Sequence, residues 1–229
     1  LFSLLGKPWL VSTGSALAKF ALALRIPVGW AVRPTVYAQF CGGESIDDSE
    51  GAIAKLAEHG VRTILDYSAE GQTDESDLDH TCSEVLATIQ AADSDARHAF
   101  AVFKVSGLSS NALLEKVGQS LRGEAELTPE EHAAWERVQA RVRTLCEATH
   151  QAGGRIMVDA EESWIQDAID AVAEDMMSDY NRDNVVVFNT VQMYRHDRLA
   201  YLKAMAARAQ EAGHLAGVTL VRGAYMEKE

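Results

Sequence analysis

Basic residues are scarce in this chain of 229 residues. It has 21 lysines and arginines against 34 aspartates and glutamates, which leaves a formal net charge of −13. Proteins that bind a nucleic-acid backbone do so mainly through clustered lysine and arginine, so this composition argues against nucleic-acid binding. The sequence also lacks a polybasic run that would attract an anionic membrane surface.

Cysteines are few, and their placement fits neither a disulfide framework nor a zinc site. Cys41, Cys82 and Cys146 are odd in number and widely separated, which favours a reducing compartment. The 7 histidines are scattered without the spacing of metal ligands. The sequence therefore predicts no metal site.

The apolar runs are too short to cross a membrane. Residues 1–26 are rich in apolar side chains, but polar and charged residues interrupt them, whereas a membrane span needs about 20 apolar residues in succession. No charged segment precedes residues 1–5, which argues against a signal peptide. Because Leu1 is not a natural first residue, we expect the chain to be trimmed at its N-terminus.

Apolar residues are nevertheless abundant enough, at 47% of the chain, to form a sizeable core. We predict a helical N-terminal arm over residues 1–48, with helices at 16–24 and 32–40, followed by one larger domain over residues 49–229. The first helix of that domain should be capped by Asp48 or Ser49, with Leu56 on its apolar face.

Five short apolar runs alternate with helical patterns in the larger domain. The five strands should start near residues 61, 99, 155, 185 and 218. The longest gap, between the second and third strands, holds an additional helix that begins at Thr128 and Pro129, with Glu131 completing a capping box. Strands that alternate with helices predict a parallel sheet covered by helices.

Two α/β architectures fit this alternation: a TIM-type (βα)8 barrel and a doubly wound open sheet. The GxGxxG phosphate signature of the open sheet follows none of the strands. Charged residues recur at the strand ends, which favours a barrel. Five units are too few to close a barrel, so either three more units follow Glu229 in the parent protein or the fold is an open half-barrel. We favour a missing C-terminal part.

The residues at the strand ends are the candidates for chemistry, because α/β enzymes bind ligands there. Asp66, Lys104, Asp159 and Arg222 each end a predicted strand. Lys104 suits a substrate carboxylate or a Schiff base. Alternatively, it reaches solvent at the barrel rim or forms a structural ion pair with Asp159.

Other residues at these ends have less specific interpretations. Glu161 should share one side with Asp159 by strand alternation, and Glu162 suits dipole compensation at the next helix start. Gln192 offers the donor and acceptor needed to bind a heterocycle's edge, or it is a solvated strand end. Arg222 suits a phosphate or pyrophosphate and Gly223 allows close backbone approach, although a strand end with a turn glycine has the same pattern.

Six segments, in this order, together resemble the proline dehydrogenase family, flavin enzymes that oxidise L-proline. They are FCGGESI (40–46), TILDYSAEG (63–71), FKVSGL (103–108), MVDAEESWIQDAID (157–170), FNTVQMYRHDRLAYL (188–202) and LVRGAYMEKE (220–229). The resemblance implies a distorted (βα)8 barrel that holds FAD at the carboxyl ends of its strands and follows a helical arm.

The resemblance also implies a reaction and partners. Hydride would pass from C5 of L-proline to flavin N5 and give Δ1-pyrroline-5-carboxylate. Electrons would then pass to a membrane quinone, so the enzyme would be cytoplasmic with peripheral contact at the inner membrane, or mitochondrial if the source is eukaryotic.

Site roles follow from the same resemblance, position by position. Asp159 matches the family's catalytic aspartate. The positions that match substrate-binding residues are Lys104, Leu220 and Tyr225. The positions that match FAD-contacting residues are Ala160, Gln192, Arg222, Gly223 and Ala224.

Two departures from the family pattern affect these expectations. Thr219 stands where the family usually has arginine or lysine near the flavin. The paired arginines that clamp the proline carboxylate in the family belong to a later helix that residues 1–229 do not include. Two other functions stay open: a Schiff-base aldolase that uses Lys104, and a non-catalytic fragment.

Overall fold

A computed structural model describes residues 8–24, 37, 41–67, 69 and 71–223. The chain divides into two compact units, residues 1–55 and 56–229, which are treated separately. In the first unit α2 (Pro8–Ala23) begins earlier than the helix predicted over 16–24. The helix predicted over 32–40 lies outside the described residues, apart from Tyr37.

Helix α5 (Ile46–Ala57) contains the boundary between the units and starts two residues before the predicted cap. The prediction of Asp48 or Ser49 as the cap was wrong because Ser45 performs this role. The Ser45 hydroxyl accepts a hydrogen bond from the Asp48 backbone amide at 3.1 Å, which satisfies an amide that has no partner within the first turn. Leu56, predicted on the apolar face, is 42% exposed.

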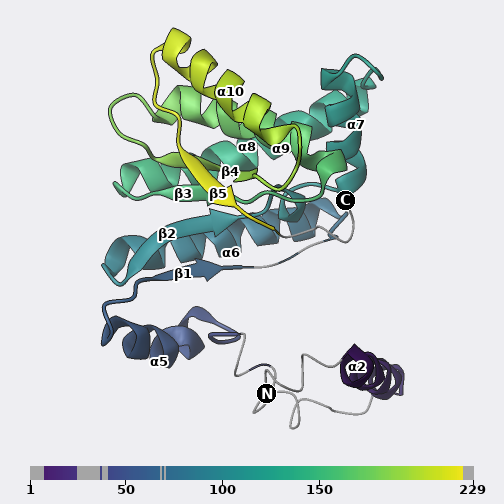
Figure 1. Ribbon diagram of the computed structural model, residues 1–229, viewed down its shortest axis with the longest axis vertical. Helices are drawn as coiled ribbons and strands as arrows, with labels where there is room; N and C mark the ends of the chain where they lie inside the picture. Colours follow the sequence, from purple (N-terminus) through teal and green to yellow (C-terminus); the bar gives the residue numbers. More distant parts are fainter. Residues whose placement is uncertain (1–7, 25–36, 38–40, 68, 70, 224–229) are drawn as a thin grey trace. The chain divides into compact units, whose positions relative to one another are not determined.

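The second unit contains a sheet of five parallel strands in chain order (Figure 1). The strands are β1 (Thr63–Asp66), β2 (His98–Phe103), β3 (Ile156–Val158), β4 (Val187–Gln192) and β5 (Val218–Val221). Each strand pairs in parallel with the next one in the chain. A doubly wound sheet would reverse its strand order at a switch point, so the sequential order confirms the barrel-type winding.

Helices connect the strands and cover the sheet. They are α6 (Glu75–Ser94), the short 3-10 helix η2 (Val105–Gly107), α7 (Asn111–Leu121), α8 (Pro129–Gln151), α9 (Ser163–Tyr180) and α10 (Arg198–Ala212). The predicted capping box of α8 is present, with Thr128 and Glu131 bonded reciprocally. Gly213 ends α10 with φ of +72°, a conformation that favours glycine.

The two faces of the sheet differ in their packing. Phe103, Ile156, Val158 and Val187 are fully buried against the helices and form the core with them. Side chains alternate along a strand, so Phe100, Met157 and Phe188 lie on the opposite face and are only partly buried. The Phe100 and Phe188 rings meet edge to face, with centroids 5.2 Å apart. We refer to the face of the sheet that carries Phe100, Met157 and Phe188 as the inner face.

Two large apolar residues on the helices are exposed. Trp164 in α9 is 42% exposed and Leu199 in α10 is 52% exposed. Both lie in the first turn of their helix, at the edge of the helical layer. Helical spacing identifies a face of a helix, but it does not show how far along the helix the neighbouring layer extends.

Candidate active site

The carboxyl ends of β2 and β3 bring a lysine and an aspartate together. Lys104 directly follows β2 and Asp159 directly follows β3, and the two strands pair through Phe103 and Val158. Lys104 Nζ donates to Asp159 Oδ2 at 2.8 Å. The pairing proposed from the sequence is therefore confirmed, and neither residue lies within its strand.

Asp66, at the end of β1, completes a row of three charged side chains. Its Oδ2 lies 3.6 Å from Lys104 Nζ. Asp159 and Asp66 keep 33% and 40% of their side chains exposed, and Lys104 keeps 14%. One ammonium beside two accessible carboxylates presents charges of both signs to a ligand, which is the complement of a zwitterionic amino acid.

Glu161, which strand alternation predicted to lie on the same side as Asp159, is buried. It is 2% exposed, and its carboxylate accepts hydrogen bonds from the Ser106 backbone amide at 3.0 Å and from the Ser106 hydroxyl. Burial raises the pKa of Glu161, and the two Ser106 hydrogen bonds partly offset this shift. Strand alternation placed Glu161 beside Asp159, but β3 ends at Val158 and alternation no longer applies.

Gln192, the last residue of β4, is 1% exposed, so its interpretation as a solvated strand end was wrong. Its Nε2 donates to the backbone carbonyl of Glu161 at 2.7 Å, and its Oε1 accepts a long contact of 3.5 Å from Arg195. This connects the end of β4 to the loop after β3. Ala160, in that loop, is also buried, and its amide donates to Asp159 Oδ1 at 3.0 Å.

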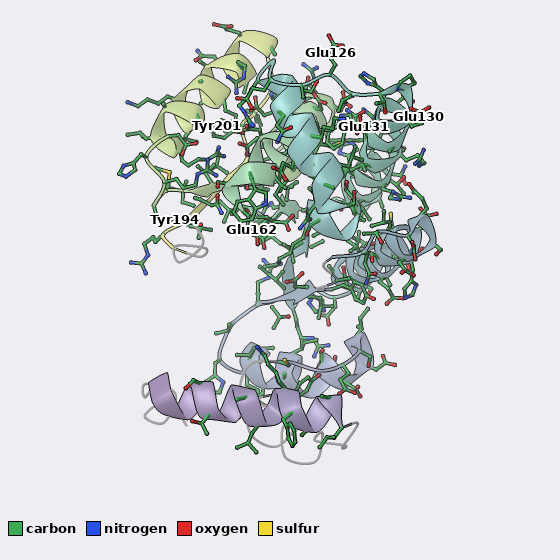
Figure 2. The ribbon with its side chains drawn as sticks, turned by 90° about the vertical axis from the view of Figure 1, so that its right-hand side faces the viewer. Glu126, Glu130, Glu131, Glu162, Tyr194 and Tyr201 are labelled. Carbon is green, nitrogen blue, oxygen red and sulfur yellow. The ribbon has the colours of Figure 1, made fainter. Side chains whose placement is uncertain are left out.

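The loops after β3 and β4 approach the same end of this unit. In Figure 2, Glu162 and Tyr194 both lie toward that end, whereas Tyr201 lies back among the helices. Glu162 is the N-cap residue of α9 and makes no side-chain capping bond. Tyr194 is partly buried.

The end of β5 is less enclosed. Arg222 and Gly223 are exposed, while the predicted residues Ala224 and Tyr225 lie outside the described residues. Leu220 is 59% exposed and pairs in register with Val191. Alternation places it on the helix-facing side of the sheet, opposite Thr219, whose hydroxyl lies 3.3 Å from Met157 Sδ. The substrate contact of Leu220 stays a prediction, and this placement does not favour it.

A buried polar cluster lies behind the strand ends, and the sequence pattern did not predict it. Asp170 of α9 pairs with Arg198 of α10 at 2.7 Å and also accepts from Gln166 and Asn189, each at 2.9 Å. The Arg198 guanidinium stacks on the Tyr201 ring, 3.9 Å from its centroid. The spacing of Gln166 and Asp170 by four residues within an apolar helix was the available signal.

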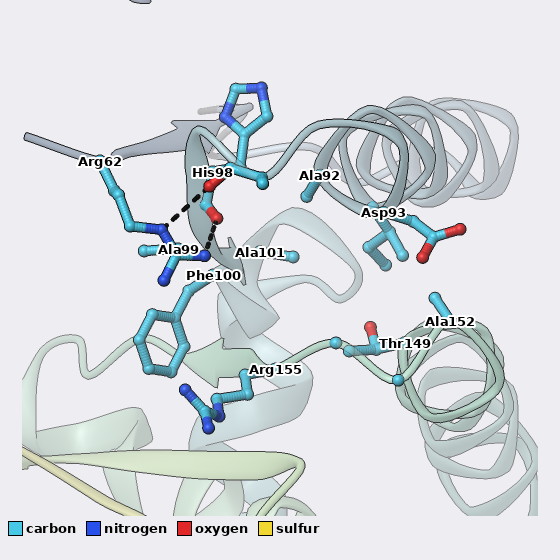
Figure 3. A pocket seen from close by; sticks show the side chains of 14 residues that line it. Arg62, Ala92, Asp93, His98, Ala99, Phe100, Ala101, Thr149, Ala152 and Arg155 are labelled. Atoms are coloured by element: carbon cyan, nitrogen blue, oxygen red, sulfur yellow. Dashed lines mark hydrogen bonds between the residues drawn. The ribbon is translucent and has the colours of Figure 1, made fainter. Parts of the chain in front are cut away.

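A separate hollow of about 260 Å³ lies at the opposite, amino end of the strands (Figure 3). Arg62, His98, Phe100 and Arg155 line part of it, and Arg62 donates to the carbonyls of Ala96 and His98 at 3.1 and 2.6 Å. None of the predicted site residues lines this hollow. The predicted site residues therefore lie away from this hollow, at the carboxyl ends of the strands.

Neither a metal site nor a membrane span is found in the described part of the chain. Within it, no three histidine, cysteine, aspartate or glutamate side chains are grouped so as to hold a metal ion. Over the same residues, no helix has both the length and the apolar character needed to cross a membrane.

Parallel strands in sequential order, covered by helices and carrying ionisable side chains at their carboxyl ends, define the class of (βα)-barrel domains. Within this class, the chain belongs to the proline dehydrogenase family, whose sequence profile matches residues 49–229. The resemblance found in the six sequence segments is thereby confirmed.

The curated relatives carry names that indicate different functions. The chain is 34% identical to the carbapenem antibiotics biosynthesis protein CarD of Pectobacterium carotovorum, over 83% of this chain and 50% of that protein. It is 27% identical to proline dehydrogenase 1 of Dictyostelium discoideum, over 91% and 42%, and to hydroxyproline dehydrogenase of Rattus norvegicus, over 88% and 52%. The chain spans about half the length of these relatives.

Solved structures establish the fold. Proline utilization A of Bdellovibrio bacteriovorus matches with a TM-score of 0.66 and 16% identity, over 82% of this chain and 20% of that one. The Bradyrhizobium japonicum protein matches with a TM-score of 0.62 and 18% identity, over 82% and 18%. The barrel-type fold expected from the strand pattern is confirmed.

Proposed function

We propose that the protein carrying this chain oxidises L-proline to Δ1-pyrroline-5-carboxylate with FAD as the hydride acceptor. The observation that carries this proposal is the Lys104–Asp159 pair, accessible at the ends of adjacent strands, in a chain of the proline dehydrogenase family. A quinone as the final electron acceptor, reached by peripheral contact with a membrane, belongs to the same proposal.

The substrate's two charged groups suit the two members of the pair. The ammonium of Lys104 would bind the proline carboxylate, and the carboxylate of Asp159 would bind the amine. The substrate would have to compete with the existing bond of 2.8 Å. Lys104 and Asp159 would each exchange the other for a group of the substrate. Both side chains would therefore keep a partner, and the two contacts would fix the orientation of the ring.

Release of hydride from the carbon beside nitrogen requires a neutral amine, because a positively charged nitrogen opposes loss of hydride. The chain therefore has to hold the substrate nitrogen without keeping it protonated. Once Lys104 has turned to the substrate carboxylate, Asp159 is the acceptor that faces the nitrogen, and the amine would release its proton to solvent, to which a third of the Asp159 side chain is exposed. Asp159 Oδ2 would then accept a hydrogen bond from the remaining N–H, since Oδ1 accepts from the Ala160 amide.

The residues around the strand ends fit a flavin. Val102 and Met157 pair in register on the inner face, one residue before the carboxyl ends of β2 and β3, and give an apolar surface beside the polar strand ends, as an isoalloxazine with one polar edge requires. Gln192 Oε1 has only a 3.5 Å contact from Arg195 and retains acceptor capacity.

The cofactor would supply the two-electron redox chemistry, and the chain would orient it against the substrate. Residues that would hold it are Ala160 through its backbone, Gln192, Arg222, Gly223 and Ala224. Arg222 is exposed at the end of β5 and suits the pyrophosphate.

The geometry disfavours the Schiff-base alternative. A lysine that attacks a carbonyl must be neutral, whereas Lys104 lies 2.8 Å from one carboxylate and 3.6 Å from another. Both carboxylates favour the ammonium form, which is not nucleophilic.

The test is proline-dependent reduction of a dye by the full-length protein. Asp159→Ala should lower kcat/KM by roughly 10- to 100-fold, the effect of losing a charge-assisted hydrogen bond. The matched control is Asp179→Ala, which breaks an exposed pair with Arg143 of 3.1 Å far from the strand ends and should leave the rate unchanged.

Two outcomes of that assay and one separate trapping experiment decide between the candidate functions. Undiminished activity of the Asp159 variant would remove this residue from the catalytic role. Faster turnover of hydroxyproline than of proline would reassign the substrate, in line with the hydroxyproline dehydrogenase relative. Trapping of a carbonyl substrate on Lys104 by borohydride in a colourless protein would establish the aldolase function instead.

A further inference from the structure

Glu161 is buried and is linked to three of the proposed site residues, namely Lys104, Asp159 and Gln192. It follows Asp159 by two residues, and its partner Ser106 follows Lys104 by two residues. The loops after β2 and β3 are thus joined twice, by the accessible pair Lys104–Asp159 and by the buried pair Ser106–Glu161. The buried pair holds the two loops in one register whether or not a ligand opens the accessible one.

The same residue orients Gln192 through its backbone. The carbonyl of Glu161 accepts from Gln192 Nε2 at 2.7 Å, which leaves Gln192 Oε1 with only the 3.5 Å contact from Arg195. The backbone amide of Glu161 donates to Gln166 Oε1 at 2.9 Å, and Gln166 Nε2 donates to Asp170. Glu161 is therefore held at its amide, its carbonyl and its carboxylate, and a change at the carboxylate will shift the carbonyl that orients Gln192.

A purely structural role would not need a carboxylate at this position. Burial opposes the ionised form, and an apolar side chain would fill the same space at lower cost to folding. The carboxylate instead uses both oxygens on one serine, with one bond to the backbone and one to the side chain. This arrangement specifies a geometry between two loops.

We propose that Glu161 is a positioning residue that holds the Lys104–Asp159 pair and the Gln192 amide in one arrangement for substrate and flavin. The role rests on the proposed function, since it concerns the same site. In this role Glu161 does not contact the reacting atoms. It acts through Ser106 and through the loop between β3 and α9.

The test compares three variants of the full-length protein: Glu161→Gln, Ser106→Ala and Asp170→Asn. Glu161→Gln keeps the size of the side chain but turns an amide nitrogen toward a Ser106 donor. Ser106→Ala removes only the hydroxyl and serves if the glutamine variant fails to fold. Asp170→Asn is the control, a buried carboxylate that contacts neither Ser106 nor Gln192 in the described residues. An asparagine keeps the Oδ1 acceptor that Gln166 uses and loses the Oδ2 pair with Arg198, so the Gln166 bond to the Glu161 amide is preserved.

The readouts are the visible absorption spectrum of the bound flavin, kcat and KM for proline, and the melting temperature. Glu161→Gln should alter the flavin spectrum and lower kcat by roughly 10-fold, because small displacements of positioned groups slow a reaction strongly. Ser106→Ala should change both in the same direction by less. Asp170→Asn should lower the melting temperature and leave the spectrum and kcat unchanged below that temperature.

Failure of this role and failure of the proposed function give different results. An active, flavin-containing wild type together with an unchanged spectrum and kcat in Glu161→Gln and Ser106→Ala overturns the positioning role alone. The same holds if Asp170→Asn changes the spectrum and kcat as much. A wild type that binds no flavin and oxidises no proline overturns the proposed function, and this role with it.

Discussion

Two ion pairs of almost equal length, one at the strand ends and one between α9 and α10, differ in how far they are exposed to solvent. Lys104 and Asp159 are 2.8 Å apart and keep 14% and 33% of their side chains exposed. Arg198 and Asp170 are 2.7 Å apart and keep 2% and 6%. Both aspartates use both oxygens within the protein, but the Asp170 side chain is closed to solvent, whereas Asp159 keeps a surface that a ligand can reach.

The difference shows how burial decides what an ion pair does. When a buried pair is broken, one desolvated charge is left without a partner. A ligand that took over one member of such a pair would therefore destabilise the fold. An accessible pair contributes little to stability and can exchange partners. Stability should therefore depend on the α9–α10 pair and activity on the strand-end pair, and each prediction tests this division.

The largest expected effect is on stability, from Asp170→Ala. Loss of this carboxylate leaves the Arg198 guanidinium buried and unpaired and removes an acceptor from Gln166 and Asn189. We expect the free energy of unfolding to fall by about 3–5 kcal/mol, measured by urea denaturation. A loss below about 1 kcal/mol would show that the two pairs do not differ as described.

The next effect is on substrate binding, from Lys104→Met. We expect kcat/KM for proline to fall by roughly 10- to 100-fold, with little change in stability, because the pair is accessible. Prolinamide keeps the ring and amine without the carboxylate, so its weaker turnover should be unaffected by the substitution. Lys116→Met is the matched control, since Lys116 Nζ also lies 2.8 Å from a carboxylate, that of Glu131, on a helical surface.

A smaller effect concerns acid stability and Glu75. Hydrogen bonds from Arg137 and Arg141 lower the pKa of Glu75 from 4.5 to about 2. A lowered pKa gives stability that is fully present above 4.5 and is lost as the pH falls through about 2. Because Glu75 is half-exposed, solvent screening limits this contribution to about 1 kcal/mol. Glu75→Gln should remove that part of the acid dependence in unfolding measurements between pH 2 and pH 6.

The contribution of Glu161 to stability should depend on pH in the opposite direction to that of Glu75. Burial raises its pKa above the ordinary value of 4.5, so the folded protein binds the proton more tightly than the unfolded chain does. The free energy of unfolding should then decline as the pH rises from about 4.5 through the raised pKa, and Glu161→Gln should lack this decline. An equal slope in the wild type and the variant would contradict the burial of this carboxylate.

The strand pattern and the strand-end charges were predictable from the sequence because they depend on local features. Apolar runs bounded by turn residues identified all five strands, and the order of a parallel sheet then brought Lys104 beside Asp159. The capping box at Thr128 likewise depends only on neighbouring residues.

The burial of Glu161 and Gln192 was not predictable in the same way. Each has the appearance of a polar residue at a strand end, and each is buried because a residue more than 30 positions away lies against it. The exposure of Leu199 and Trp164 was not predictable either, since the extent of a packed layer is a tertiary property.

The most direct test of the division between the two pairs is a double-mutant cycle on Lys104→Met and Asp159→Asn in the full-length protein, read as kcat/KM for proline. If the pair binds the substrate as one unit, the double variant should be little worse than the poorer single variant. Fully additive losses, or a wild-type rate in either single variant, would contradict the central claim that this accessible pair recognises the amino acid.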